Sequence, residues 1–529
     1  RRALDYLAGR IRSQPLPLPA AARAAYQLAI DLILALAHGY ERGIVADAGR
    51  LRGRRLALAA ERALSLYGER MLRTHQTYTA LDACFWQQVN GIYAATEAAG
   101  VAARAVDDPE LRFARRPRQS PQDMYKRLLL FALAGTQGFR PGEAARLSRA
   151  LESWKDHARL ASPAEAADSG HPRFAVDLQS AEGPRPLQGD ERAGSLRVLE
   201  VGELVVEVER LREARGPQNK ALPAEDEVGP TALARLVDSW QPANHERDRR
   251  AHRGSEVDAE ATLRVIHARL VLERRPRHER AGAHGGRSDT PPEQPPEEWS
   301  IEEIDAAESV LGRHPDEVRP GVNWTEIPHG RERSAAQEEA RAFEAGAQPE
   351  VLPEAPPRWL LKDVSTSGFR LVWDGQGSCR VAVGEPVALR IGHAGERSRW
   401  CCGLVRRMRF VDEQSFEIGV EVLARTTIPA RVRVEPANPN AGRQRDDAGA
   451  TPALLLPASP AGVRRTTLLI PAHLHRSGDV LELDLHERTT RIALGRLVED
   501  TGTVSQFEVA PAPERGRHAP SDTRFVASL

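Results

Sequence analysis

The first third of the chain carries apolar residues at the spacing of amphipathic helices. Leu28, Leu32 and Leu36 recur every four residues, so together they draw one apolar stripe along a helix. Stripes of the same period follow at Leu56, Ala60, Leu64, Tyr67 and Met71, at Trp86, Val89 and Tyr93, and at Leu147, Leu151 and Trp154. Antiparallel helical hairpins bury such stripes against one another. The sequence therefore predicts an N-terminal helical hairpin domain over residues 1–165.

Residues 166–244 mix the helical period with short strand-like runs. The runs 174–178 and 196–199 are apolar and rich in strand-forming residues, which predicts two β-strands. The stretches 204–211 and 233–240 return to the helical period. We expect a mixed α/β region here. Its residues show none of the spacings that a catalytic site requires.

Residues 245–272 combine a basic cluster with an apolar run. Four arginines fall within the nine residues from 245 to 253. The run 261–272 that follows is partly apolar on both its even and its odd positions, which we interpret as a buried strand. This segment is predicted to supply the first strand of a β-domain that resumes further along the chain.

Residues 273–357 lose the regular alternation of apolar and polar positions. The run 291–296 is rich in proline, and the segment 293–308 holds seven acidic residues with no lysine or arginine. Low apolar content with clustered charge is typical of chains that cannot bury enough surface to fold. We predict a disordered Pro/Glu-rich insertion, which limited proteolysis should cut first.

Period-two alternation dominates the rest of the chain. Short strand candidates separated by turn residues run through 358–434, and a second set runs through 450–512. Strands at such spacing predict small antiparallel barrels. The first barrel would comprise 245–272 and 358–434, the second 450–512, with a flexible tail at 513–529. The predicted fold class is multidomain α+β.

Composition narrows the possible functions. The chain has 74 basic and 74 acidic residues and a formal net charge of zero, so no overall positive field attracts nucleic acid or an anionic membrane. The most apolar window, 26–37, contains Asp31 and is too short to span a bilayer. The four cysteines include no C-x-x-C pair. We therefore expect a cytoplasmic protein without a membrane span and without a polymeric nucleic acid partner.

The segment from Asp363 to Gly368 separates two of the predicted strands. Aspartate and serine side chains cap the backbone of turns, and glycine adopts conformations that other residues avoid, so any hairpin could carry these residues. The spacing Asp363-x-Ser365-x-x-Gly368 also resembles the signature of the PilZ-domain family. The chain is similar in layout to long proteobacterial PilZ proteins that have a helical N-terminal region.

The resemblance implies a ligand and the residues that would bind it. PilZ domains are receptors for cyclic di-GMP, in which an Arg-x-x-x-Arg arm precedes the first barrel strand and faces the signature turn. Here Arg249 and Arg253 match that arm, with Arg250 beside them. By this resemblance the aspartate accepts hydrogen bonds from a guanine edge, and Gly368 lets the backbone approach closely. We also expect a positive φ at Gly368, which would make Gly368→Val disruptive.

Three classes of function remain open at this point. The first is a non-catalytic cyclic di-GMP receptor that signals to a protein partner in motility, pilus or biofilm control. The second is a degenerate PilZ scaffold, or a chaperone-like interaction protein, that binds no nucleotide. The third is an enzyme, which the sequence disfavours because it has no Gly-rich phosphate loop, metal cluster or nucleophile motif. We predict no cofactor other than the ligand.

Overall fold

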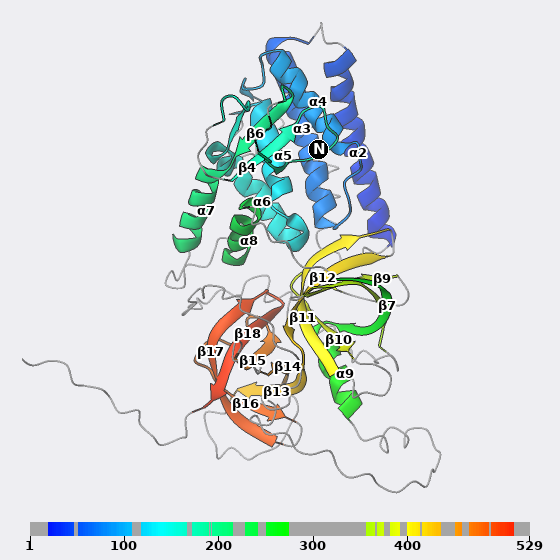
Figure 1. The fold of residues 1–529 in the computed structure, drawn as a ribbon, viewed down its shortest axis with the longest axis vertical. Helices are drawn as coiled ribbons and strands as arrows, with labels where there is room; N and C mark the ends of the chain where they lie inside the picture. The colour runs from blue at the N-terminus through cyan, green and yellow to red at the C-terminus, as the bar shows by residue number, and fades with distance from the viewer. Residues whose placement is uncertain are drawn as a thin grey trace, which may run out of the picture.

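The protein is described here from a computed structural model. It defines residues 20–46, 51–107, 118–166, 172–189, 191, 193–214, 228–241, 250–274, 356–365, 368–374, 381–391, 399–412, 415–434, 450–457, 465–485 and 488–512. These residues form a helical body with a small sheet and, below it in Figure 1, two β-barrels drawn in green to yellow and in orange to red.

The helical body confirms the predicted helical N-terminal region. Helix α5 begins at a capping box, in which Ser120 and the Asp123 side chain bond each other's backbone N–H groups. The α-helices are α2 (Ala20–Ala46), α3 (Gly53–Gln76), α4 (Phe85–Ala98), α5 (Pro121–Leu133) and α6 (Pro141–Trp154); the short elements are β1 (Val106–Asp107), β2 (Arg118–Gln119), η2 (Thr136–Gly138) and η3 (Lys155–His157). The predicted stripe of α3 is buried along its length, from Leu56 to Met71.

Helix α2 buries a different face from the one that the leucine repeat indicated. Leu28, Leu32 and Leu36 are 52, 38 and 48 % exposed, whereas Ile33 and Ala37 are buried. The helix is apolar on both faces, so its period alone does not choose between them. The smaller and β-branched residues face α3, with which α2 makes its main contacts.

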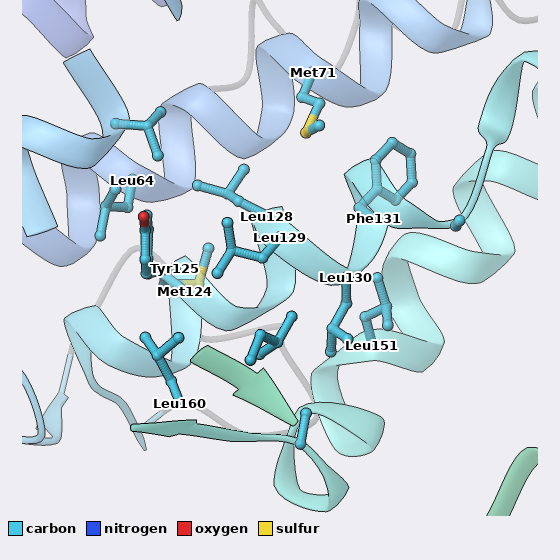
Figure 2. Close-up of a cluster of buried hydrophobic side chains, with 14 of the residues drawn as sticks. Leu64, Met71, Met124, Tyr125, Leu128, Leu129, Leu130, Phe131, Leu151 and Leu160 are labelled. Atoms are coloured by element: carbon cyan, nitrogen blue, oxygen red, sulfur yellow. The ribbon is translucent and has the colours of Figure 1, made fainter. Parts of the chain in front are cut away.

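The mixed region shares its core with the helices. Its sheet has the strand order β3-β6-β4-β5 and is accompanied by two helices. These elements are β3 (Arg159–Ala161), β4 (Arg173–Asp177), β5 (Arg185–Pro186), β6 (Leu196–Glu200), α7 (Gly202–Ala214) and α8 (Pro230–Trp240). One continuous cluster of buried side chains runs from Ala37 on α2 to Trp240 on α8. Figure 2 shows part of it, where α5 with Leu128 and Leu129 lies between α3, which carries Leu64 and Met71, and the strand that carries Leu160. The regions expected at 1–165 and 166–244 therefore form one packed body.

The first barrel is closed and six-stranded, and each neighbouring pair of strands is antiparallel. Its strands are β7 (Arg250–Ala261), β8 (Arg358–Ser365), β9 (Gly368–Trp373), β10 (Pro386–Ile391), β11 (Arg399–Phe410) and β12 (Phe416–Ala424). Closure removes the open strand edges that would otherwise invite aggregation. The long segment between β7 and β8 includes residues 275–355, so the disorder predicted there lies outside the described residues.

The strand predicted at 261–272 is wrong. The first barrel strand ends at Ala261, Thr262 takes a positive φ of 68°, and helix α9 runs from Leu263 to Arg274. Leu263, Ile266 and Leu270 follow the helical period and are buried. The run looked apolar on both strand faces because its true period is 3.6 residues, and the helix packs against elements on several sides.

The second barrel is also closed and six-stranded. Its strands are β13 (Ile428–Val434), β14 (Thr451–Leu456), β15 (Thr467–Pro471), β16 (Val480–Leu485), β17 (Arg488–Asp500) and β18 (Val504–Pro511). Strand β13 was expected to end the first barrel, but it pairs with β14 and β16. The second barrel therefore begins at Ile428, ahead of the polar linker that suggested the boundary.

Helix α9 and a set of ion pairs join the two barrels. A buried cluster combines Leu263, Ile266 and Leu270 of α9 with residues from both barrels, including Trp400 and Leu454. Arg406 on β11 donates to Glu499 on β17 at 2.7 Å and to Glu421 on β12 at 2.7 Å. These contacts hold the fifth strand of the first barrel against the fifth strand of the second.

Candidate functional site

The signature turn forms a tight hairpin on the first barrel. Strands β8 and β9 pair antiparallel up to the closing pair of Ser365 with Gly368. The Ser365 hydroxyl donates to the Gly368 carbonyl oxygen at 3.3 Å. Thr366 and Ser367 lie outside the described residues. The hairpin that the sequence predicted between the two strands is thus present, and it places all three signature residues at one end of the barrel wall.

Gly368 is required by close approach and not by its φ angle. A Cβ atom at this position would lie 2.2 Å from the carbonyl oxygen of Val420 on the neighbouring strand β12. The φ of Gly368 is outside the left-handed region, so the positive φ expected from the sequence is wrong. Any side chain here would push β9 away from β12, because the contact is with backbone and cannot relax by a rotamer change.

Asp363 is directed toward an arginine that the sequence analysis did not single out. The register of β8 against β9 shifts between Leu361 and Asp363, which opposes Asp363 to Arg370. The Oδ2 atom of Asp363 lies 2.8 Å from Nε of Arg370, and the two side chains are 15 and 33 % exposed. The buried Nε–H of Arg370 nevertheless has no hydrogen-bond partner, so this close ion pair is poorly aligned. Alternation along Gly368-Phe369-Arg370 is the sequence signal that could have identified this residue.

Arg250 and Arg253 of the arginine arm lie within the first strand and do not precede it. At backbone level Arg250 pairs with Val364, and Ala251 pairs with Asp363. The register then shifts between Ala251 and Ser255, a span that includes Arg253. Arg249 lies just outside the described residues. The structure thus brings the backbone of the arm directly beside the signature turn, whereas the sequence had placed an intervening strand at 261–272.

A side chain from the helical body closes the interior of this barrel. Tyr78, which follows α3, is buried within the barrel's core cluster. Its hydroxyl donates to the carbonyl oxygen of Phe139 at 2.7 Å, and its own carbonyl accepts from Phe410 N–H at 2.8 Å. Burial raises the pKa of Tyr78, so the phenol stays neutral. Its φ of 55° is unusual for a non-glycine residue. The signature barrel is therefore docked on the helical body through a buried contact.

Two other kinds of function find no support among the described residues. No group of three or more histidine, cysteine, aspartate or glutamate side chains among them could hold a metal ion. None of the described helices combines the length and the apolarity that crossing a membrane requires. The signature turn with its arginine neighbours remains the strongest candidate site.

A closed six-stranded antiparallel barrel with this turn is a PilZ-type domain, and family models agree. The model described as "Cyclic-di-GMP receptor FimW, middle PilZ domain" matches residues 173–429. The model "Cyclic-di-GMP receptor FimW, N-terminal domain" matches residues 1–165, and "FimW C-terminal beta-barrel domain" matches residues 441–511. The chain therefore belongs to the PilZ-domain family, whose matched members are receptors and not enzymes.

One curated relative extends this similarity over most of the chain. The cyclic-di-GMP receptor FimW of Pseudomonas aeruginosa is 25% identical over 505 residues, which cover 93% of this chain and 79% of the relative. No solved structure matches this chain. The recognition of a long PilZ protein from the sequence is confirmed.

Proposed function

We propose that this protein is a non-catalytic receptor for cyclic di-GMP. The observation that carries the proposal is the signature turn on a closed barrel wall, with Asp363 opposite the strand that begins with the arginine arm. A ring with two phosphates and two guanines needs forks of N–H donors and planar cations, both of which arginine supplies. The PilZ family and the FimW relative support the same ligand.

The proposed roles follow from the chemistry of each side chain. Asp363 accepts hydrogen bonds from the N–H groups of a guanine edge, and in doing so it replaces its poorly aligned contact with Arg370. Arg249, Arg250 and Arg253 bind the phosphates and stack on the purines. Ser365 keeps the turn tight, and Gly368 lets strand β9 lie directly against the backbone of β12.

Isothermal titration of the purified protein with cyclic di-GMP tests this function. Saturable binding is expected, together with much weaker binding of cyclic di-AMP, because adenine presents a different donor pattern to Asp363. Asp363→Ala should weaken binding tenfold or more, since hydrogen bonds to charged groups contribute about 1.5–3 kcal/mol. Arg465→Ala, an exposed position on the second barrel, is the control and should leave affinity unchanged.

The arginine arm requires its own test. Arg249→Ala and Arg253→Ala should each weaken binding tenfold or more by the same reasoning. Unchanged affinity in both variants would remove the arm from the site. An absence of saturable binding by the wild-type protein would instead favour the scaffold function that the sequence also allowed.

The proposed receptor also needs a protein partner to which it signals and a cellular compartment in which it acts. We propose a protein partner, in motility, pilus or biofilm control, that docks on the helical body or the second barrel; the exposed leucines of α2 are available for such contact. A reducing cytoplasm is proposed because Cys84, Cys401 and Cys402 are free thiols, two of them buried.

A further inference from the structure

A small cavity lies on the outside of the first barrel, where the barrel meets the helical body. It has a volume of about 140 Å³ and is lined by Arg370, Arg407, Arg409, Glu417 and Gln137. The first four residues come from strands β9, β11 and β12, and Gln137 comes from η2. We call this space the arginine cavity. It opens beside the signature turn, since Arg370 also contacts Asp363.

A glycine in the middle strand allows the arginines to converge. Arg370 pairs across the sheet with Gly419, and Gly419 pairs in turn with Arg407. A Cβ atom on Gly419 would lie 2.5 Å from Nε and 2.7 Å from Cγ of Arg407. The side chain of Arg407 therefore lies over the bare backbone of Gly419, on the strand that separates it from Arg370.

Glu417 lies beside the guanidinium groups of Arg370 and Arg409 without occupying all of their N–H donors. Glu417 lies 3.7 Å from Arg370 and 3.5 Å from Arg409, which are long distances for direct hydrogen bonds. Arg370 and Arg409 are 33 and 48 % exposed. Each guanidinium carries five N–H donors in a fork that matches phosphate oxygens. The chemistry of the lining therefore suits a phosphate group, and the cavity is large enough to admit one.

The helical body is fixed against this cavity. A Cβ atom on Gly138 would lie 2.9 Å from the carbonyl oxygen of Arg406, so η2 packs directly on the backbone of β11. Arg235 of α8 donates to the Gly138 carbonyl at 2.7 Å and holds the turn from behind. Gln137 consequently reaches the cavity from a rigid support in the other domain.

We propose that the arginine cavity is an anion-binding site that takes a phosphate group of the nucleotide bound at the signature turn. The phosphate bridges Arg370 and Arg407 on the barrel and meets the Gln137 side chain of the helical body. The bound ligand thereby contacts residues of both domains at the place where the domains meet. This inference rests on the proposed receptor function, and it adds Arg370, Arg407 and Gln137 to the binding residues.

Titration of cyclic di-GMP into Arg407→Gln tests the proposal. The affinity should fall about tenfold or more, and its decrease with added salt should be shallower than in the wild type, because one ionic contact is lost. The matched control is Arg496→Gln, since Arg496 lies on the fifth strand of the second barrel as Arg407 does on the first. The control should retain both the affinity and the salt dependence of the wild type.

Gly419→Ala provides a second variant that keeps the charge but displaces the Arg407 side chain. It should weaken binding several-fold and serves as the test if Arg407→Gln does not fold. Gln137→Ala should weaken binding by a smaller factor while leaving the salt dependence intact. Thermal melting of each variant establishes that it is folded.

The outcomes separate this inference from the receptor function. If the wild type binds cyclic di-GMP, Asp363→Ala weakens it, and Arg407→Gln and Gly419→Ala both stay within twofold of wild type, the arginine cavity is not part of the site and the receptor function stands. If the wild type does not bind cyclic di-GMP, the receptor function fails and the inference fails with it.

Discussion

The two barrels of this chain share one strand order but differ in what surrounds it. In each barrel the first strand pairs with the second and fourth, the third with the second and sixth, and the fifth with the fourth and sixth. Only the first barrel carries the Asp-x-Ser-x-x-Gly turn between its second and third strands. In the second barrel ten residues, 457–466, make that connection and lack the signature. A common fold therefore does not imply a common ligand, because the proposed binding site depends on the side chains at one turn.

The barrels also differ in how their interiors are closed. The core of the first includes Tyr78 from the helical body, whereas the described core of the second consists of its own residues. A ligand on the first barrel is thus close to a buried contact between domains. The first barrel is thus joined to the helical body through its core, whereas the second meets the helical body at Gly502, which lies against the Arg140 side chain.

The largest expected change in stability comes from a substitution in helix α9. This helix follows the first strand of the first barrel and packs against both barrels. Arg269 of α9 donates to Glu260 of β7 at 2.7 Å, and the side chains are 2 and 4 % exposed. Arg269→Met leaves Glu260 buried without its cation, which should destabilise the protein by about 3–5 kcal/mol in urea unfolding.

The double variant Glu260→Leu with Arg269→Met provides the control for that prediction. It should recover most of the loss, because no uncompensated charge remains. Burial raises the pKa of Glu260 against the opposing effect of Arg269, so the single variant should be less destabilised at acidic pH, where the carboxyl is protonated. A single variant as stable as the double one would mean that the pair is unimportant.

The next largest change in stability distinguishes two glycines, each of which lies near a backbone carbonyl oxygen of the neighbouring strand. Gly368→Ala places a Cβ atom 2.2 Å from a backbone oxygen, whereas Gly495→Ala on the second barrel places it 3.3 Å from the Glu508 carbonyl. The first substitution should cost about 3 kcal/mol or more and abolish binding, and the second should stay within about 1 kcal/mol of wild type. Thermal unfolding and nucleotide titration measure both. Equal losses in the two variants would contradict the close approach of β9 to β12.

Acidification should lower the free energy of unfolding by a smaller amount. His267 of α9 faces the second barrel, and burial together with nearby Arg431 lowers its pKa to about 4. The unfolded chain takes up a proton below pH 6.5 while the folded chain does not, so stability falls as pH drops from 6.5 toward 4. The loss attributable to this residue should reach about 2 kcal/mol at pH 5.

His267→Gln is the variant that isolates this contribution. His75 in the helical body also has a pKa lowered to about 4 by burial. The stability of the wild type therefore depends on pH through both histidines. The difference in unfolding free energy between wild type and variant should shrink between pH 7 and pH 5. A constant difference over that range would show that His267 does not titrate as described.

The smallest effect contrasts two ion pairs on the barrel surfaces. Arg496 contacts Glu508 at 2.8 Å on the second barrel, and Arg370 contacts Asp363 at 2.8 Å on the first. Partly exposed pairs contribute little, so Arg496→Gln and Arg370→Gln should each change stability by less than about 1 kcal/mol. Only Arg370→Gln should alter cyclic di-GMP affinity. Altered affinity in Arg496→Gln would show that the second barrel also takes part in binding.

The sequence by itself determined the local features of this protein. The stripe from Leu56 to Met71 was buried as its period predicted, because helical spacing fixes which residues share a face. The hairpin from Asp363 to Gly368 also followed from local residues, since turn chemistry acts over a few positions. The same six residues, together with the strand pattern that follows them, indicated the family, although the positive φ expected at Gly368 was wrong.

Other features were decided only when distant segments packed together. The exposed face of α2 depends on neighbours that the local pattern does not contain. The run 263–274 allowed both a strand and a helical spacing, and packing against several elements buries the helical one. Strand β13 pairs with β14 and β16 of the second barrel, because the first barrel is closed by six other strands and has no open edge for it. The arginine cavity required the register of three strands, the missing side chain of Gly419 and the docking of Gln137. Period and turn chemistry act within a few residues, whereas register, closure and domain contacts join positions that are far apart in the chain, so only the tertiary structure could bring these groups together.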